Sequence, residues 1–498
     1  MNRHFDSSGR NSWEGFPKSS FGRIDYFEQI DDEEETYFLG LSVIDALSFQ
    51  EIMTESQTRR GGKGYWEDFW IIRFKDPDTL TADEHRRLVQ MEEKFDNLRL
   101  FHIVLEGKKR DRSNLVSVFD QEALDMQMSD WMNFEMVSSR SSNEDREVKS
   151  YGGLFSEPVS AFLKEIRPAA PEDKSKLDTV FSMKNWPCSG SSQVKNELKN
   201  VEASFLTCYD VGQGLSTSLL AECLRTTLHY DIGTGVYRNA HTRIPNLILC
   251  NSGNSPIILS HWDTDHWAGA RYCAPPSNPD VFLKRTWIAP KDLSIGPTHI
   301  VFAEEIIRSG GNILLWDPSV RSTINIKLAD RRCLSLIKGR GKGRNESGIA
   351  LMVKNSINDD KWLLTGDVEY ENLFKTNPPR FVAMTVPHHG ARLKNNSIVP
   401  SPSPQSYRRL IYSFGHGNSY KHPTDQCIDS HISFGWNHGS WNPPPFGHTI
   451  PGGDVLSTAT RKKPFQHLGA SIIGWNYPPL SLPIIPCDSQ CNASLRQS

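Results

Sequence analysis

Paired cysteines are the first feature that this sequence lacks. The chain of 498 residues has nine cysteines, which is an odd number, and contains no CxxC motif. This pattern argues against a secreted disulfide scaffold and indicates reduced thiols in a cytosolic protein. Cys487 and Cys491, in the stretch CDSQC, could bind a metal, but no second pair completes a site and we do not assign one.

Long apolar runs are also absent. No stretch approaches the roughly 18 apolar residues that a membrane span needs. The N-terminal stretch MNRHFDSSGRNSWEGF lacks the apolar core of a signal peptide. We therefore expect a soluble, cytoplasmic protein with no membrane partner.

Apolar residues and net charge are both scarce. Hydrophobic residues make up 37% of the chain, which is low for one compact core, so much of the chain must form loops, surface or accessory segments. The formal net charge of −3 argues neither for nor against a nucleic-acid partner, which would need a local basic patch. The length suggests two or more domains.

The first 200 residues carry no cluster of ligand-type side chains. Residues 1–21 are polar and are expected to be a disordered tail. Residues 22–165 are expected to form an N-terminal accessory domain of mixed α/β type, which could bind a protein partner. Residues 166–200 are rich in proline, serine and lysine and are expected to be a linker.

Two elements are predicted inside the accessory domain. Residues 81–100 have the pattern of an amphipathic helix, with Thr81 and Glu84 as a capping box. Its apolar face is formed by Leu88, Met91, Phe95 and Leu98. The preceding segment FWIIRF is predicted to be a buried strand.

From residue 201 onwards, short apolar strands alternate with glycine-rich polar turns. Each predicted strand ends in a polar cluster, and the strands lie in SFLTCYDVGQG, LHYDIGTG, PIILSHWDTDH, IALMVKN, KWLLTGD, RFVAMTVPHHG and RLIYSFGHGN. In layered α/β folds, ligands and catalytic groups gather at strand ends, on loops that a rigid sheet holds in place. We therefore look for the chemistry at these turns.

The stretch SHWDTDHWAG, residues 260–269, carries the densest polar cluster. It places His261, Asp263, Asp265 and His266 directly after the apolar run PIIL. Such groups repel or desolvate one another unless a partner compensates them, and a divalent cation does so directly. Imidazole and carboxylate donors together suit zinc, manganese or iron.

Three later strand ends extend the series. Asp367 follows KWLLTG and is suited to bridge two metal ions. VPHHG supplies His388 and His389, and SFGHGNSYKHP adds His416 and His422. A single cluster would be weak evidence, but the ordered series favours a metal site.

In this order of motifs, residues 201–440 resemble the metallo-β-lactamase superfamily, and in particular the hydrolase domain of ComEC-type DNA-uptake proteins and their free-standing relatives. The motifs that carry the resemblance are DVGQG, YDIGTG, SHWDTDHWAG, NESGIALMV, LLTGD, VPHHG and NSYKHP. The resemblance implies an α/β fold, a four-layered αββα sandwich with the metals at one edge of its two sheets. Residues 441–498 would be a C-terminal extension that packs on this domain or trails from it.

The resemblance also implies roles for the ligands of two divalent ions, zinc in the first place and manganese as the alternative. His261 and Asp263 would serve the first ion, Asp265 and His266 the second, and Asp367 would bridge them. A histidine of the HHG motif would complete a shell. His388 is taken as that ligand and His389 as a catalytic group, with the reverse assignment open.

The chain departs from the family pattern at several positions. Ala270, Ala391 and Lys421 stand where the family often has glycine, serine and glycine. None of these changes removes a ligand, but they leave the substrate open. His299 is the only histidine between the first motif and Asp367, and we assign it no role.

Two metal ions would activate water and clamp the attacking and leaving oxygens, which suits phosphodiesters but also lactams, thioesters and other acyl groups. Asp265 is predicted to orient the water, and His389 or His422 to protonate the leaving group or hold a phosphate oxygen. The candidate substrate-binding residues are Arg340, Lys342, Arg344, Asn345, Ser347, Arg392 and Lys421. The first three belong to a glycine-interleaved basic loop suited to a nucleic-acid backbone, although a solvated loop would look the same.

Three hypotheses follow. The first is a metal-dependent phosphodiesterase, in particular a nuclease. The second is a hydrolase of a small phosphodiester or acyl substrate. The third is a metal-stabilised interaction protein without catalytic activity, and the complete ligand set argues against it.

Overall fold

The computed structural model describes residues 1–31, 36–58, 65–108, 130–143, 145–317, 323–394, 397–439, 453–459, 469–475 and 495–497. The chain divides into two compact units. Unit 1 comprises residues 1–187 and 292–308, and unit 2 comprises residues 188–291 and 309–498. The domain boundaries expected from the sequence stay predictions.

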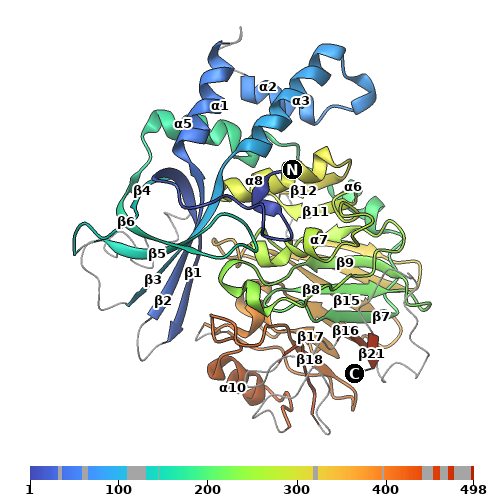
Figure 1. The fold of residues 1–498 in the computed structure, drawn as a ribbon. Coiled ribbons are helices and arrows are strands. Elements are labelled where there is room, and N and C mark those ends of the chain that lie inside the picture. Colours follow the sequence, from blue (N-terminus) through green and yellow to red (C-terminus); the bar gives the residue numbers. More distant parts are fainter. Residues whose placement is uncertain are drawn as a thin grey trace. The chain divides into compact units, whose positions relative to one another are not determined.

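Unit 1 is built on a closed six-stranded barrel with the strand order β1-β2-β3-β5-β6-β4 (Figure 1). The strands are β1 (Ser19–Asp31), β2 (Thr36–Asp45), β3 (Leu100–Lys108), β4 (Met132–Val137), β5 (Arg146–Tyr151) and β6 (Val159–Pro168). Apolar side chains such as Leu41, Ile103 and Phe134 are buried in one cluster that joins these strands. Every neighbouring pair is antiparallel, so the barrel closes without a free sheet edge.

Helices of unit 1 confirm one sequence prediction and correct another. The described helices of its first 187 residues are α1 (Ala46–Thr58), α2 (Tyr65–Arg73), α3 (Ala82–Asn97) and α5 (Pro171–Val180). In α3 the capping box of Thr81 and Glu84 is formed as predicted. The predicted strand FWIIRF is wrong, because most of it lies in α2. The buried side chains Trp66, Phe69 and Trp70 follow the three-to-four-residue period of a helix, which the short apolar run concealed.

Two segments expected to be unstructured are ordered. Within residues 1–21, His4 and Phe5 are fully buried, and the side chain of Asn2 donates hydrogen bonds to the carbonyl oxygens of Phe95 and Leu98. Within residues 166–200, helices α5 and α6 (Ser191–Leu198) form and bury apolar side chains. Polar composition predicted disorder and a linker, but a few buried anchors suffice to order such a segment.

Helix α8 (Pro297–Arg308) belongs to unit 1, although in sequence it lies between two strands of unit 2. His299 Nε2 lies 2.8 Å from Asp25 Oδ1, and Glu304 forms an ion pair of 2.8 Å with Arg73. His299 thus pairs with an aspartate of unit 1. From the sequence, no role in the metal site was assigned to it.

Unit 2 contains two mixed sheets. The first has the order β12-β11-β10-β9-β8-β7-β20-β21 and the second the order β13-β14-β15-β16-β17-β18-β19 (Figure 1). The first sheet contains β7 (Phe205–Tyr209), β8 (Ser216–Leu220), β9 (Thr226–Ile232), β10 (Ile257–Ile258), β11 (Thr286–Pro290), β12 (Asn312–Trp316), β20 (Ala470–Ile473) and β21 (Leu495–Gln497). The second contains β13 (Thr323–Lys327), β14 (Arg332–Lys338), β15 (Ile349–Asn355), β16 (Lys361–Leu364), β17 (Ala383–Thr385), β18 (Arg409–Tyr412) and β19 (Val455–Ser457). All seven apolar runs predicted as strands contain one.

One apolar core joins the two sheets. It includes Tyr230 and Ile258 of the first sheet and Leu336, Leu351 and Trp362 of the second. A further cluster on the second sheet packs under α10 (Asp425–Ser433), which buries Cys427 and Ile428 there. Strands from the predicted C-terminal extension add to both sheets. The chain therefore has the expected mixed α/β class with several sheets.

Candidate metal centre

Strand ends from both sheets bring the polar residues together. In the first sheet β9 and β10 run parallel, and Asp231 and Ser260 lie at or just beyond their carboxyl ends. In the second sheet β16, β17 and β18 run parallel, and Asp367, His388 and Ser413 follow them. Parallel strands present their carboxyl ends at one edge, and a hydrogen bond from the Ile349 amide to the Ser260 carbonyl oxygen (2.8 Å) links the sheets there.

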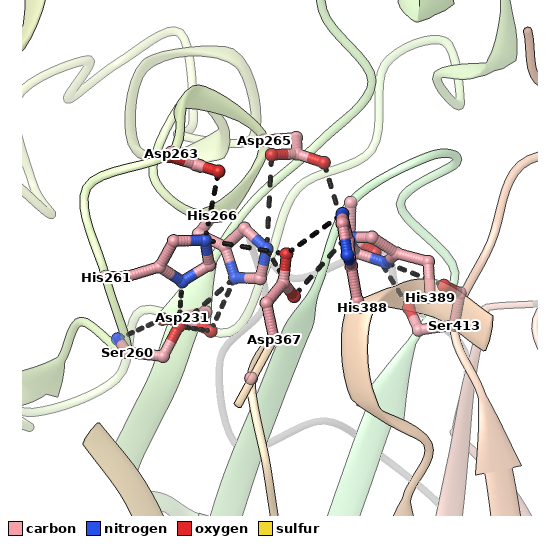
Figure 2. A network of polar contacts seen from close by, with 12 residues as sticks. Asp231, Ser260, His261, Asp263, Asp265, His266, Asp367, His388, His389 and Ser413 are labelled. Atoms are coloured by element: carbon pink, nitrogen blue, oxygen red, sulfur yellow. Dashed lines mark hydrogen bonds and ion pairs between the residues drawn. The ribbon is translucent and has the colours of Figure 1, made fainter. Parts of the chain in front are cut away.

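Asp367 lies at the centre of the cluster, as Figure 2 shows. Its Oδ1 atom faces His266 Nε2 at 3.1 Å and His389 Nε2 at 3.9 Å. Its Oδ2 atom faces His261 Nε2 at 3.5 Å and His388 Nε2 at 3.6 Å. The two oxygens of one carboxylate thus divide the histidines into two groups.

An aspartate completes each group. Asp263 Oδ2 lies 3.3 Å from His261 Nε2, and we call His261, Asp263, His388 and Oδ2 of Asp367 site 1. Asp265 lies 3.3 Å from His389 Nε2 and 3.9 Å from His266 Nε2, and these three residues with Oδ1 of Asp367 are site 2. Ligands about 2.1 Å from a tetrahedral ion lie about 3.4 Å from one another, which is close to these separations.

The histidine rings are held by their other nitrogen atoms. Nδ1 of His266 donates to Asp231 Oδ2 at 2.8 Å, and Nδ1 of His389 donates to the Ser413 carbonyl oxygen at 2.8 Å. Nδ1 of His261 lies 2.9 Å from Ser260 Oγ, which itself donates to Asp231 Oδ2 at 2.8 Å. Each bond keeps the proton on Nδ1 and turns the lone pair of Nε2 toward Asp367, as in metal sites.

Four buried atoms at this centre make no well-aligned hydrogen bond to the described residues. They are Nε2 of His261, His266 and His389 and Oδ1 of Asp367. Buried polar atoms are almost always hydrogen-bonded, so four such atoms in one cluster need a partner. Among the described residues, two sets of side chains have donor atoms close enough to hold a metal ion. One is His261, His266 and Asp367, and the other is Asp265, His266 and His389. The donor chemistry therefore fits a divalent cation.

The electrostatics point the same way. Burial disfavours a charged His266, but Asp367 and Asp231 outweigh burial and hold its pKa well above the ordinary value. Burial also opposes ionisation of Asp367, but His266, His388 and His261 outweigh it and hold the pKa of this carboxyl well below its ordinary value. The carboxylates thus stabilise positive charge at the centre, where a cation would be favoured.

A strained turn places the two adjacent histidines on different sides of Asp367. His388, His389 and Gly390 have φ angles of 49°, 56° and 89°. Non-glycine residues rarely adopt positive φ angles, and such strain gathers at functional sites. Both histidines of the HHG motif consequently approach Asp367, His388 at Oδ2 and His389 at Oδ1, so the choice between them that the sequence left open stays open.

The other predicted residues lie at different distances from the centre. The ring of His422 is buried and packs edge-on against that of His388, with centroids 5.6 Å apart. Asn345 and Ser347 form the turn before β15, where the Ser347 amide donates to the Gly343 carbonyl oxygen and the Gly348 amide to that of Asn345. Both candidate sites are thus formed without Asn345 and Ser347.

Two arginines of the glycine-interleaved loop are already engaged. Arg340 donates to the carbonyl oxygens of Leu373 and Glu371, both at 3.1 Å. Arg344 donates to Asp263 Oδ1 at 2.7 Å. Lys342, Arg392 and Lys421 are exposed. The predicted flexible basic loop is therefore partly folded onto the protein.

Sequence reasoning missed three groups that orient the ligands. Asp231, Ser260 and the Ser413 carbonyl oxygen hold the Nδ1 atoms of the three buried histidines. Asp231 stands in YDIGTG, at a strand end like the others, and its position was the available signal. A backbone carbonyl leaves no such signal.

Comparisons with known proteins give little. No protein-family model matches the chain, and no curated protein matches it. One similar solved structure is the metallo-beta-lactamase fold protein YhfI from Bacillus subtilis, with 10% identity over 46% of this chain and 93% of that chain and a TM-score of 0.28. Another is a protein of unknown function from Enterococcus faecalis V583, with 11% identity over 42% of this chain and 55% of that chain and a TM-score of 0.23. Likenesses of this size establish neither a common fold nor a common activity.

Among the described residues, no helix combines the length and the apolar character that crossing a membrane requires. No disulfide joins any two of the seven described cysteines, and Cys487 and Cys491 lie outside the described residues.

Proposed function

We propose that this protein is a metal-dependent hydrolase of the metallo-β-lactamase superfamily that cleaves phosphodiesters. The observation that carries the proposal is the cluster of four buried atoms, one of them Oδ1 of Asp367, that make no well-aligned hydrogen bond to the described residues. The order of the sequence motifs supports the superfamily, its four-layered αββα fold and the ComEC-type branch.

The chain offers donors for two ions. His261, Asp263 and His388 would hold one, Asp265, His266 and His389 the other, and Asp367 would bridge them. Bound there, zinc or manganese would lower the pKa of a water molecule and stabilise charge on the attacking and leaving oxygens. Our sequence assignment of His389 as a catalytic group is thereby changed to that of a ligand.

The protein's own groups would position the reactants. The side chain of Asp265 is 23% exposed and thus reachable by water, which it can orient by accepting a hydrogen bond. The ring of His422 packs against that of His388 of site 1, with centroids 5.6 Å apart, and His422 is our candidate for proton donation to the leaving group.

A phosphodiester is the favoured substrate because Arg344 contacts a candidate ligand and further cations lie close to candidate ligands in the sequence. Arg344 lies at Asp263, and Lys342, Arg392 and Lys421 are exposed on neighbouring loops. Nucleic acid is the polymer that would use all of these cations. A small phosphodiester is the second candidate, since Arg340 and Arg344 already have protein partners.

The experiment combines metal analysis with hydrolysis of bis(4-nitrophenyl) phosphate and of single- and double-stranded DNA. Asp367→Ala should lose both bound metal and turnover and keep the circular-dichroism spectrum, because this carboxylate is expected to serve both ions and lies at a strand end. Wild-type activity in this variant would refute the two-ion assignment. Cleavage of the small ester without cleavage of DNA would favour the second candidate.

A further inference from the structure

We propose that Arg344 makes the two cation sites unequal by neutralising Asp263, so that site 2 fills first and site 1 binds its ion weakly until an anionic substrate draws Arg344 away. This inference rests on the proposed function and concerns the regulation of the same centre.

The ion pair between Arg344 and Asp263 carries the inference. Nη1 of Arg344 lies 2.7 Å from Asp263 Oδ1, and the two side chains are only 7% and 14% exposed. Water therefore screens the pair weakly. The guanidinium occupies one oxygen of Asp263, while the other oxygen faces His261.

Site 2 has no such competitor among the described residues. Within the described part of the chain, Asp265 forms ion pairs with the imidazoles of His266 and His389 alone, and both rings are buried. In site 1, by contrast, the ring of His388 is 30% exposed. Site 2 thus combines a full carboxylate charge with buried, oriented donors, and site 1 combines a neutralised carboxylate with a less buried histidine.

Arg344 affects the affinity of site 1 in two opposite ways. Its charge repels the ion, and its hydrogen bond orients Asp263, and the repulsion is the larger effect. A single positive charge about 6 Å from a divalent ion weakens binding roughly tenfold even with the dielectric constant of water. Releasing the rotamers of one carboxylate weakens binding by only about two- to fivefold. Removal of the guanidinium should therefore strengthen site 1.

An anionic substrate would act on the same ion pair. A phosphate oxygen that accepts hydrogen bonds from Arg344 releases Asp263, and the affinity of site 1 then rises. By linkage, an ion in site 1 raises the affinity for the anion by the same factor. The second ion would thus bind to site 1 together with the substrate.

The test is calorimetric titration of the metal-free protein with Mn²⁺, with and without dimethyl phosphate. The wild-type protein should bind one ion tightly and a second ion more weakly, and dimethyl phosphate should tighten the second step. Arg344→Met keeps the apolar stem and should tighten the second step about tenfold. The same variant should abolish the effect of dimethyl phosphate.

Two further variants separate charge from position. Arg340→Met removes the same charge from the same loop, but its guanidinium binds carbonyl oxygens, so both binding steps should stay unchanged. Asp263→Asn should remove the second step and leave the first. A thermal melt of each variant verifies that it is folded, and Arg344→Lys, which keeps the charge, should keep the two steps apart if Arg344→Met does not fold.

The outcomes are distinct. Two equal binding steps in the wild-type protein, or a weaker second step in Arg344→Met, would overturn this inference and leave the proposed function standing. Failure of the wild-type protein to bind any Mn²⁺ or Zn²⁺ would instead overturn the proposed function.

Discussion

At the residue scale, the candidate centre depends on where each histidine carries its proton. Asp231 accepts hydrogen bonds from the Ser260 amide (2.7 Å), the Ser260 hydroxyl and His266 Nδ1, so this one carboxylate orients two histidines. It is fully buried and sits at a positive φ angle of 57°, which a rigid surrounding must maintain. Asp231 is thus a positioning residue of the centre.

Asp231→Asn should weaken metal binding about 10- to 100-fold, the usual cost of losing the carboxylate partner of a ligating histidine. The amide cannot accept all three hydrogen bonds with a full negative charge, so the Nδ1 proton of His266 becomes less firmly placed. The measurement is Zn²⁺ affinity by competition with a chromogenic chelator. Asp359→Asn, which removes an exposed aspartate of the same unit, is the control and should leave the affinity unchanged. Equal affinities in both variants would show that Asp231 has only a structural role.

At the element scale, helix α10 contains a buried histidine that should make the free energy of unfolding depend on pH. Its His431 is fully buried, accepts a hydrogen bond from the Tyr370 hydroxyl (2.9 Å) at Nε2 and donates from Nδ1 to the Cys427 carbonyl oxygen (2.7 Å). The bond from Tyr370 needs the neutral ring, because a protonated Nε2 cannot accept a hydrogen bond. Burial lowers the pKa of His431 to about 3, with a smaller contribution in the same direction from His438.

Stability of unit 2 should consequently fall as the solution is acidified below pH 6.5. Between that value and pH 3 the unfolded chain binds a proton at His431 and the folded chain does not, so the free energy of unfolding decreases by up to about 1.4 kcal/mol per pH unit. Urea unfolding at pH 8, 6.5 and 5 measures the slope. His431→Gln should be less stable at pH 8 but lose less stability between pH 6.5 and 5, whereas the exposed His241→Gln should keep the wild-type slope. An unchanged slope in His431→Gln would contradict the assignment.

The exposed cations of three loops test whether the substrate is a polymer. If Lys342, Arg392 and Lys421 each contact a phosphate of single-stranded DNA, each contributes about −0.7 to the log–log slope of affinity against salt. Replacing all three with serine should flatten the slope by about 2 and leave hydrolysis of bis(4-nitrophenyl) phosphate nearly unchanged. DNA binding by fluorescence anisotropy at several salt concentrations provides the measurement. A slope equal to that of the wild-type protein would argue for a small substrate.

At the scale of the whole molecule, helix α8 belongs to unit 1 although it lies far along the sequence, at Pro297–Arg308. Its buried Ile300, Phe302 and Ile306 belong to unit 1. Its Glu304 is also buried, and burial raises the pKa of this carboxyl to about 7 although Arg73 and Arg308 oppose the shift. The part of the sequence that carries the candidate ligands thus also supplies a helix of unit 1.

A chain that begins at Asn196 would be expected from the sequence alone to keep metal-dependent hydrolysis, since every candidate ligand lies beyond that point. The contacts of α8 predict a different result. Without residues 1–195 its apolar side chains lose their cover and Glu304 loses Arg73, so the shortened chain should aggregate. Size-exclusion chromatography after expression measures this. A soluble, monomeric, metal-loaded shortened chain would show that α8 does not need unit 1.

The sequence by itself determined the chemistry of the candidate centre and most of the strands that carry it. His261, Asp265, His266 and Asp367 follow apolar runs, and each of those runs contains a strand. These signals are local, because a strand and the polar residues at its end are neighbours in the chain. The capping box of α3 was readable for the same reason.

Only the tertiary structure decided which groups meet. Asp231, Ser260 and the Ser413 carbonyl oxygen come from three strand ends in two sheets, so no local pattern shows that they orient the histidines. Arg344 and Asp263 are 81 positions apart in the sequence, and Glu304 of α8 and Arg73 are 231 positions apart. Such contacts depend on how the sheets and helices pack, and a linear pattern of residues does not contain that information.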